Sequence, residues 1–225
     1  MKRRVFLAGI GAALMSPVAV SAQQTDAVRK VGFLGNFRSD DPEGRVRTDS
    51  FIHTLQKLGW NEGVNLHTEI RWPGDDVGLN RQYAQELVDL KPDVIVAWAT
   101  PSLSALQRLT RSTPIVFANV IDPVGAGYVA SMAHPRGNTT GFTAFEYSIS
   151  GKWLELLKEF APSLARVAVV RDPALASGIG QFAAIQAFAS SSGLELTAID
   201  PDDDEAIDRG FAAKDIIDPN AESTS

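Results

Sequence analysis

The chain has 225 residues, of which 44% are hydrophobic and 21% are charged, enough apolar material for one large core or two smaller lobes. Its formal net charge is −6, which argues against nucleic acid or anionic membrane surfaces as partners. It contains no cysteine, so disulfides and thiolate metal sites are excluded.

The first 22 residues predict an export signal peptide that does not belong to the fold. Lys2, Arg3 and Arg4 form a basic start, an apolar run follows over residues 5–15, and small residues precede Gln23 as at a cleavage site. The run is too short for a spanning helix. The two arginines, followed by Val-Phe-Leu, favour the twin-arginine route, and an ordinary secretion signal is the alternative. Cleavage would remove three basic residues and no acidic ones, and would make the chain still more acidic.

Residues 23–145 predict a first lobe built from alternating strands and helices. The apolar runs are short and rich in β-branched residues, which is typical of buried parallel strands, and apolar residues at helical spacing separate them. We expect strands at 28–35, 64–72, 94–98, 115–117 and 139–145, and helices around 51–58 and 79–88, after Thr100-Pro101-Ser102 and after Asp122-Pro123. We expect the apolar face of the helix around 51–58 to include Leu58.

From residue 146 the same pattern starts again. We expect a helix over 150–160 with one apolar side, strands at 166–170 and 194–199, and helices over 177–190 and 205–211. The fold class is therefore α/β, with two doubly wound parallel-sheet lobes. The second lobe, 146–211, is shorter than a usual domain of about 100–150 residues, so we expect it to be incomplete. Residues 212–225 predict an irregular tail.

Three segments carry a resemblance to a known family. Thr100-Pro101-Ser102, the run from Pro114 to Gly127 and the run from Gly137 to Phe142 resemble the extracytoplasmic substrate-binding proteins of one ABC-transporter family. The resemblance extends to about Phe211 and implies the type I periplasmic-binding fold; some members bind aromatic amino acids. Family members continue further and complete the second lobe, so a truncated chain is a hypothesis here.

Polar residues that follow the predicted strands are the candidate ligand-binding residues. Thr100 and Ser102 open a predicted helix, whose free N–H groups and positive dipole end attract a carboxylate; capping of the helix is the alternative role. Asp122 either caps the next predicted helix or accepts a hydrogen bond from a ligand ammonium. Asn36 and Phe37 follow the first strand, and in a strand order such as 2-1-3-4-5 they would lie near these residues.

The second lobe offers Arg171, Asp172 and Ser177, which lie between a predicted strand and a predicted helix. They are either ligand-binding residues on the facing lobe or an ordinary polar turn.

Signals for catalysis, metals and cofactors are weak. Gly125, Gly127 and Ala130 fit a loose dinucleotide-binding pattern, but they fall inside a predicted helix and not in a turn. Phosphate-binding, hydrolase and zinc-protease motifs are absent from the sequence. The three histidines, His53, His67 and His134, are far apart. We therefore expect no catalytic residue, no metal and no cofactor.

The leading hypothesis is a periplasmic receptor that closes on a small amino acid or organic acid, with a hinge around residues 142–147. The resemblance implies an ABC permease in the inner membrane as its partner. Two alternatives stay open: an exported α/β hydrolase, and a non-functional remnant with exposed sheet edges.

Overall fold

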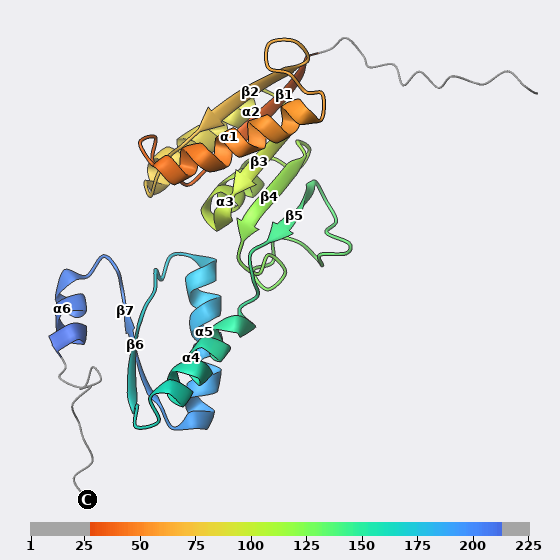
Figure 1. Ribbon diagram of the computed structural model, residues 1–225. Helices are drawn as coiled ribbons and strands as arrows, with labels where there is room; N and C mark the ends of the chain where they lie inside the picture. Colours follow the sequence, from red (N-terminus) through yellow and green to blue (C-terminus); the bar gives the residue numbers. More distant parts are fainter. Residues whose placement is uncertain (1–27, 213–225) are drawn as a thin grey trace, which may run out of the picture.

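The computed structural model describes residues 28–212 and shows two α/β lobes (Figure 1). The predicted export signal (1–22) and the tail after Ala212 lie outside the described residues. The first lobe is a parallel sheet of five strands in the order β2-β1-β3-β4-β5. These strands are β1 (Arg29–Leu34), β2 (Leu66–Arg71), β3 (Val94–Trp98), β4 (Ile115–Val120) and β5 (Thr139–Thr143). The predicted fold class and the order 2-1-3-4-5 are confirmed.

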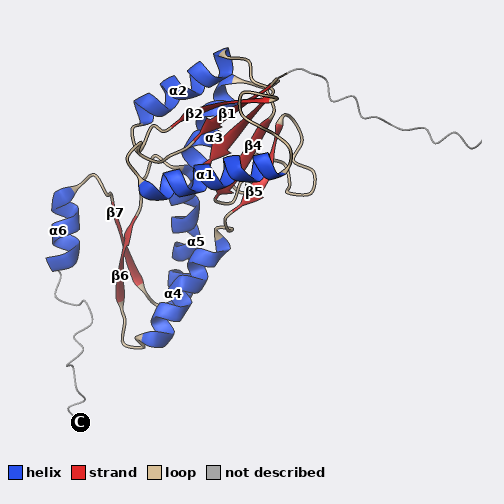
Figure 2. Cartoon of the chain, turned by 45° about the horizontal axis from the view of Figure 1, so that its top comes forward, coloured by secondary structure: helices blue, strands red, loops and turns tan. Residues whose placement is uncertain are grey.

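Helices cover both faces of this sheet, with α1 on one side and α2 and α3 on the other (Figure 2). Their bounds are Pro42–Lys57, Val77–Asp89 and Ala99–Leu109. The alternation of β1 explains the two layers: Phe33 packs against Phe51 of α1 at 5.6 Å between ring centroids, whereas Leu34 belongs to the core shared with α2 and α3. Aspartates in extended conformation cap α1 and α2: Asp41 accepts from the Glu43 N–H, and Asp76 from the Leu79 N–H.

Two details of the predicted first lobe are wrong. Leu58 ends α1 as its C-cap and is 71% exposed, so the apolar face stops one turn earlier. The chain after Asp122 does not form a helix: residues 123–127 are turns and residues 128–130 are bends. Gly125 and Gly127 lie in this segment, and Gly127 has φ +77, a left-handed conformation that interrupts an α-helix.

The second lobe contains two parallel strands with helices on both sides (Figure 1). Its elements are α4 (Ser148–Phe160), β6 (Arg166–Val170), α5 (Ala176–Ser192), β7 (Glu195–Ile199) and α6 (Asp204–Ala212). Leu154, Ala189 and Leu194 form its small buried cluster. The predicted apolar side of α4 is only partly covered, because Leu154 is buried while Trp153 is 48%, Leu156 60% and Phe160 83% exposed. None of the helices in the described residues is long and apolar enough to cross a membrane.

The connection between the lobes is fastened to the end of β4. The Ala144 N–H donates to the Val120 carbonyl, and the Asp122 N–H donates to the Phe145 carbonyl, at 2.8 and 2.9 Å. Tyr147 continues the connection: its backbone N–H donates to the Asp122 carboxylate, and its hydroxyl donates to the Ala176 carbonyl at the start of α5. Tyr147 therefore bridges the two lobes.

Gly141 in the edge strand β5 provides a test of the packing between β5 and β4. A Cβ at this position would lie 2.0 Å from the Phe117 carbonyl oxygen, so Gly141→Ala should force the strands apart and lower the free energy of unfolding by about 1–3 kcal/mol. Urea denaturation followed by circular dichroism measures the change.

The matched control is Gly151→Ala in α4, where the added Cβ would meet its nearest atom at 3.5 Å. This variant should be as stable as the parent or slightly more stable, because alanine favours a helix over glycine. Equal stability of the two variants would contradict the proposed close approach at Gly141.

Candidate functional site

The carboxyl ends of β1, β3 and β4 meet at one edge of the first sheet, because all three strands run parallel. The hydroxyl of Ser102, which is fully buried, donates to the Gly35 carbonyl after β1 at 3.1 Å. The hydroxyl of Thr100 accepts from the Ile121 N–H after β4 at 3.4 Å. The first turn of α3 therefore joins the loops on either side of it.

Neither residue caps α3, whose N-cap is Trp98 and lacks a side-chain hydrogen bond. Capping, the alternative role considered for Thr100 and Ser102, is wrong. Ser102 uses its only proton on Gly35 and is a structural link. Thr100 is 4% exposed, and its hydroxyl proton has no acceptor within the described residues. Of the two, Thr100 can still donate a hydrogen bond to a ligand.

Aromatic side chains meet at this edge. The rings of Phe37 and Trp98 lie 5.8 Å apart between centroids and are tilted by 40°. A Cβ on Gly44 of α1 would lie 2.6 Å from the Phe37 Cβ, so the glycine lets Phe37 pack closely against the start of that helix. The guanidinium of Arg47, one turn further along α1, lies 5.2 Å from the Trp98 ring centroid. Arg47 also pairs with Glu43, which partly neutralises its charge.

Asp122 is held by the protein itself. One carboxylate oxygen accepts from the Gly125 N–H at 2.7 Å, and the other accepts from the Tyr147 N–H at 3.2 Å. The carboxylate thus caps a turn instead of a helix, and it holds the connection to the second lobe. A carboxylate oxygen has more than one lone pair, so Asp122 can accept a further hydrogen bond.

The same aspartate influences Tyr147. Burial, and then the negative charge of Asp122, raise the pKa of the Tyr147 phenol above its ordinary value. The phenol is therefore protonated at neutral pH and remains a donor to the Ala176 carbonyl.

Asn36 and the backbone around it complete the edge. Asn36 is half-buried, and its side-chain amide has no hydrogen-bond partner among the described residues. Ala99, Asn119 and Asp122 have left-handed backbones, with φ of 67°, 58° and 38°. Such conformations cost on the order of 1–3 kcal/mol each in residues other than glycine, and they concentrate at functional sites.

In the second lobe, the predicted residues follow the carboxyl end of β6. Asp172 accepts from the Ala174 N–H at 2.7 Å, as in an ordinary polar turn. The guanidinium of Arg171 lies 4.8 Å from the Phe182 ring centroid. Ser177, in the first turn of α5, is 7% exposed, and its hydroxyl has no hydrogen-bond partner within the described residues.

Buried polar atoms without partners also lie at these carboxyl edges. Among the described residues they are Trp72 Nε1, Asn80 Oδ1 and Arg171 Nε. Trp72 follows β2, Asn80 lies in the early part of α2, and Arg171 follows β6. A buried polar atom without a partner is costly, so the two donors that directly follow strands, Trp72 Nε1 and Arg171 Nε, and the acceptor Asn80 Oδ1 indicate where a polar ligand or water would be stabilised.

The aromatic rings and hydrogen-bond donors at this edge can contact a small ligand. Within residues 28–212, no group of three or more His, Asp or Glu side chains is placed to hold a metal ion. The polar atoms at the edge include hydroxyl, amide and guanidinium donors, and the Asp122 carboxylate is already hydrogen-bonded by backbone N–H groups. A hollow of about 590 Å³ lies elsewhere, at the opposite edge of the first sheet.

Sequence reasoning missed Trp98 and Arg47. The sequence predicts Trp98 as the last residue of a buried strand, and its position two residues before Thr100-Pro101-Ser102 is the signal that could have placed it at the strand exit. No sequence pattern points to Arg47, because its position over the ring depends on how α1 crosses the sheet.

The chain matches the family model described as ABC transporter substrate binding protein over residues 42–209. The chain therefore belongs to the ABC transporter substrate-binding protein family. The predicted resemblance is confirmed.

Individual relatives agree with this assignment. A tyrosine-binding protein of Clostridioides difficile is 30% identical over 146 residues, which cover 65% of this chain and 42% of that protein. The crystal structure of a conserved domain protein from Vibrio cholerae superposes with a TM-score of 0.68 at 29% identity. The structure of an ABC domain from Streptococcus pneumonia in complex with L-Trp superposes with a TM-score of 0.67 at 21% identity.

Each of the two structures is matched over 77% of this chain and 57% of its own length. This chain thus spans about half the length of its relatives. The solved neighbours have the type I periplasmic-binding fold, which confirms the predicted fold.

Ser102 provides a test of how the edge is held together. Ser102→Ala leaves the Gly35 carbonyl without the hydroxyl that donates to it and should lower the free energy of unfolding by about 1–3 kcal/mol. Chemical denaturation measures the loss. Ser104→Ala is the control on the same helix, because the Ser104 hydroxyl has no partner within the described residues; a comparable loss in the control would contradict the role of Ser102.

Proposed function

We propose that the protein is the solute receptor of an ABC importer and binds an amino acid or organic acid between its two lobes. The observation that carries this proposal is the aromatic pair of Phe37 and Trp98, with Arg47 beside it, at the edge where parallel strands end. Ligands of open α/β sheets bind at this edge. The unpaired donors of both lobes lie at the corresponding ends of their strands.

In this proposal the first lobe holds both the apolar and the charged part of the ligand. An aromatic or apolar side chain packs against Trp98 and Phe37. The ligand carboxylate accepts from Thr100 and from the first N–H groups of α3, where the helix dipole is positive. Asn36 hydrogen-bonds the remaining polar group, and Asp122 receives the ammonium group of an amino acid.

The second lobe closes the site. Arg171 and Ser177 have donors without partners, and Asp172 lies beside them in the same turn. Closure would bring these groups toward the ligand and remove it from water. The hinge is the segment 142–147, with Tyr147 as its fixed point, because this residue bonds both lobes.

The names of similar proteins support an aromatic amino acid as the ligand. One relative is called a tyrosine-binding protein, and one structural neighbour contains L-Trp. The aromatic pair in this chain has the chemistry to recognise such a side chain.

The receptor binds its ligand without changing it chemically. The predicted N-terminal signal would direct its export into the periplasm. There an ABC permease of the inner membrane would receive the loaded receptor. Family membership supports the transporter partner.

Binding by the purified chain tests the function. We expect L-tryptophan or L-tyrosine to raise the free energy of unfolding by about 2.7 kcal/mol at one hundred times its dissociation constant. Thermal unfolding and isothermal titration calorimetry measure this over a panel of amino acids and small carboxylates. Absence of binding across the panel would sink the proposal, and turnover of generic esters or phosphoesters would favour the exported hydrolase instead.

Trp98→Ala tests the aromatic wall. Loss of a central aromatic contact costs about 2 kcal/mol or more, so the affinity for the best ligand should fall roughly thirtyfold. The matched control is Trp60→Ala: Trp60 lies at the opposite edge of the same lobe, lines a separate hollow with Leu55 and Leu66, and is 38% exposed. The control should bind like the parent; equal loss in both variants would contradict the site.

A further inference from the structure

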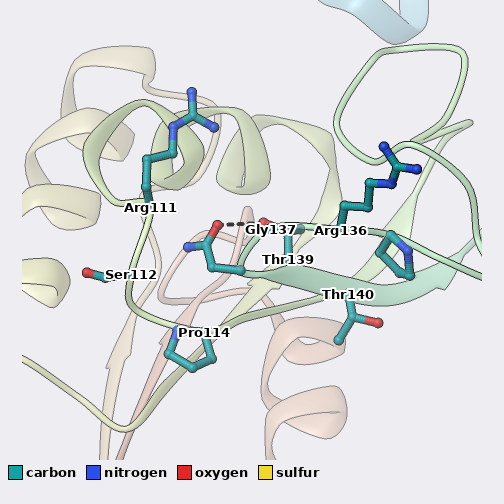
Figure 3. Close-up of a pocket in the computed structure, with 9 residues that line it drawn as sticks. Arg111, Ser112, Pro114, Arg136, Gly137, Thr139 and Thr140 are labelled. Atoms are coloured by element: carbon teal, nitrogen blue, oxygen red, sulfur yellow. Dashed lines mark hydrogen bonds between the residues drawn. The ribbon is translucent and has the colours of Figure 1, made fainter.

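The hollow of residues 111–114 and 135–140 lies at the amino ends of β4 and β5, on the edge of the first sheet opposite the proposed ligand site. It has a volume of about 590 Å³, and its lining comes from the loop after α3 and the loop before β5. Figure 3 shows Arg111 and Arg136 on these two loops, with both side chains extending to the same side of the hollow.

The charge of this hollow is unbalanced. Its lining contains two arginines and no acidic residue. Neither Arg111 nor Arg136 has an ion-pair or hydrogen-bond partner within the described residues. Arg29, Arg38, Arg47, Arg71 and Arg209, in contrast, all pair with carboxylates. The hollow therefore carries two guanidiniums that no carboxylate of the described residues pairs with, in a chain with a net charge of −6.

Some of the polar groups between the arginines already hydrogen-bond to other residues of the protein. Asn138 donates to the Thr113 carbonyl at 2.6 Å, and Gln107 donates to the Thr139 hydroxyl at 3.0 Å. These bonds hold the two loops together and fix the floor of the hollow. The hydroxyls of Ser112 and Thr140 have no partner among the described residues and remain available as donors.

We propose that this hollow binds an oxyanion, a phosphate or carboxylate group carried by a small molecule, through Arg111 and Arg136. A guanidinium offers donors in a planar fork that matches both groups. Ser112 and Thr140 supply neutral donors beside it. The carboxyl end of α3 lies near Arg111 and contributes roughly half a negative charge, which two full positive charges exceed.

The site is separate from the proposed solute site. Its lining shares no residue with the aromatic edge, which lies at the carboxyl ends of β1 and β3. Occupancy of the hollow would draw together the loop after α3 and the loop before β5, since each supplies one arginine.

Isothermal titration calorimetry with the full chain tests the proposal, with inorganic phosphate and citrate as probes at constant ionic strength. We expect saturable binding of at least one probe, and the stronger probe identifies the phosphate or carboxylate source. The double variant Arg111→Gln/Arg136→Gln should bind at least about tenfold more weakly. The double variant Arg111→Lys/Arg136→Lys should bind with intermediate affinity, because lysine keeps the positive charge but lacks the planar set of guanidinium donors.

Arg108→Gln is the matched control. Arg108 is exposed in the last turn of α3, has no partner within the described residues and does not line the hollow. Its binding should equal that of the parent. The proposal is overturned by the absence of saturable binding, by undiminished binding in a correctly folded double variant, or by an equal loss in the control. Binding of an acidic peptide alone, with neither small probe bound, would also overturn it.

The amino-acid titration of the double variant separates this inference from the proposed function. The double variant should bind the amino acid like the parent, and Trp98→Ala should bind phosphate or citrate like the parent. A loss of both ligands in either variant would show that the two sites are not separate.

Discussion

The parallel pairing of β1 with β3, and of β3 with β4, is the constraint on which the rest of this structure depends. It brings the three loops that follow these strands to one edge, so that residues distant in sequence can share one site. The hydrogen bond from Ser102 to the Gly35 carbonyl then links two of these loops directly across the first turn of α3. Aromatic contact between Phe37 and Trp98 follows from the same proximity.

The candidate ligand-binding residues of the two lobes divide into those that hold the fold and those that remain available. Ser102, Asp122 and Asp172 have their hydrogen-bonding groups engaged by the backbone. Asn36 and Ser177 have none engaged within the described residues. Sequence position does not separate the two groups, because both occur after strands. Whether a side chain is hydrogen-bonded depends on its distance and angle to neighbouring carbonyl and N–H groups.

The two sites proposed for this protein lie at opposite edges of the first sheet and would recognise different chemistry. The carboxyl edge combines aromatic rings with scattered donors, which suits an amphipathic solute, and it faces the connection to the second lobe through Asp122 and Tyr147. The amino edge carries two unpaired arginines over a hollow. One parallel sheet can present both because its loops alternate between the two ends.

By itself the sequence determined the alternation of strands and helices and the fold class, because short β-branched runs and helical spacing depend on local chemistry. The family was indicated separately, by the resemblance that three segments carry. Strand ends could be located within a few residues, and Thr100, Asp122 and Asn36 were proposed from them as candidate ligand-binding residues. The turns after Asp122 were missed because a Pro in a first turn resembles a helix start whether or not the helix continues past Gly125 and Gly127. Only the tertiary structure placed Arg47 over Trp98 and set Arg111 and Arg136 around one hollow, because both arrangements depend on how separate elements pack, which no local pattern records.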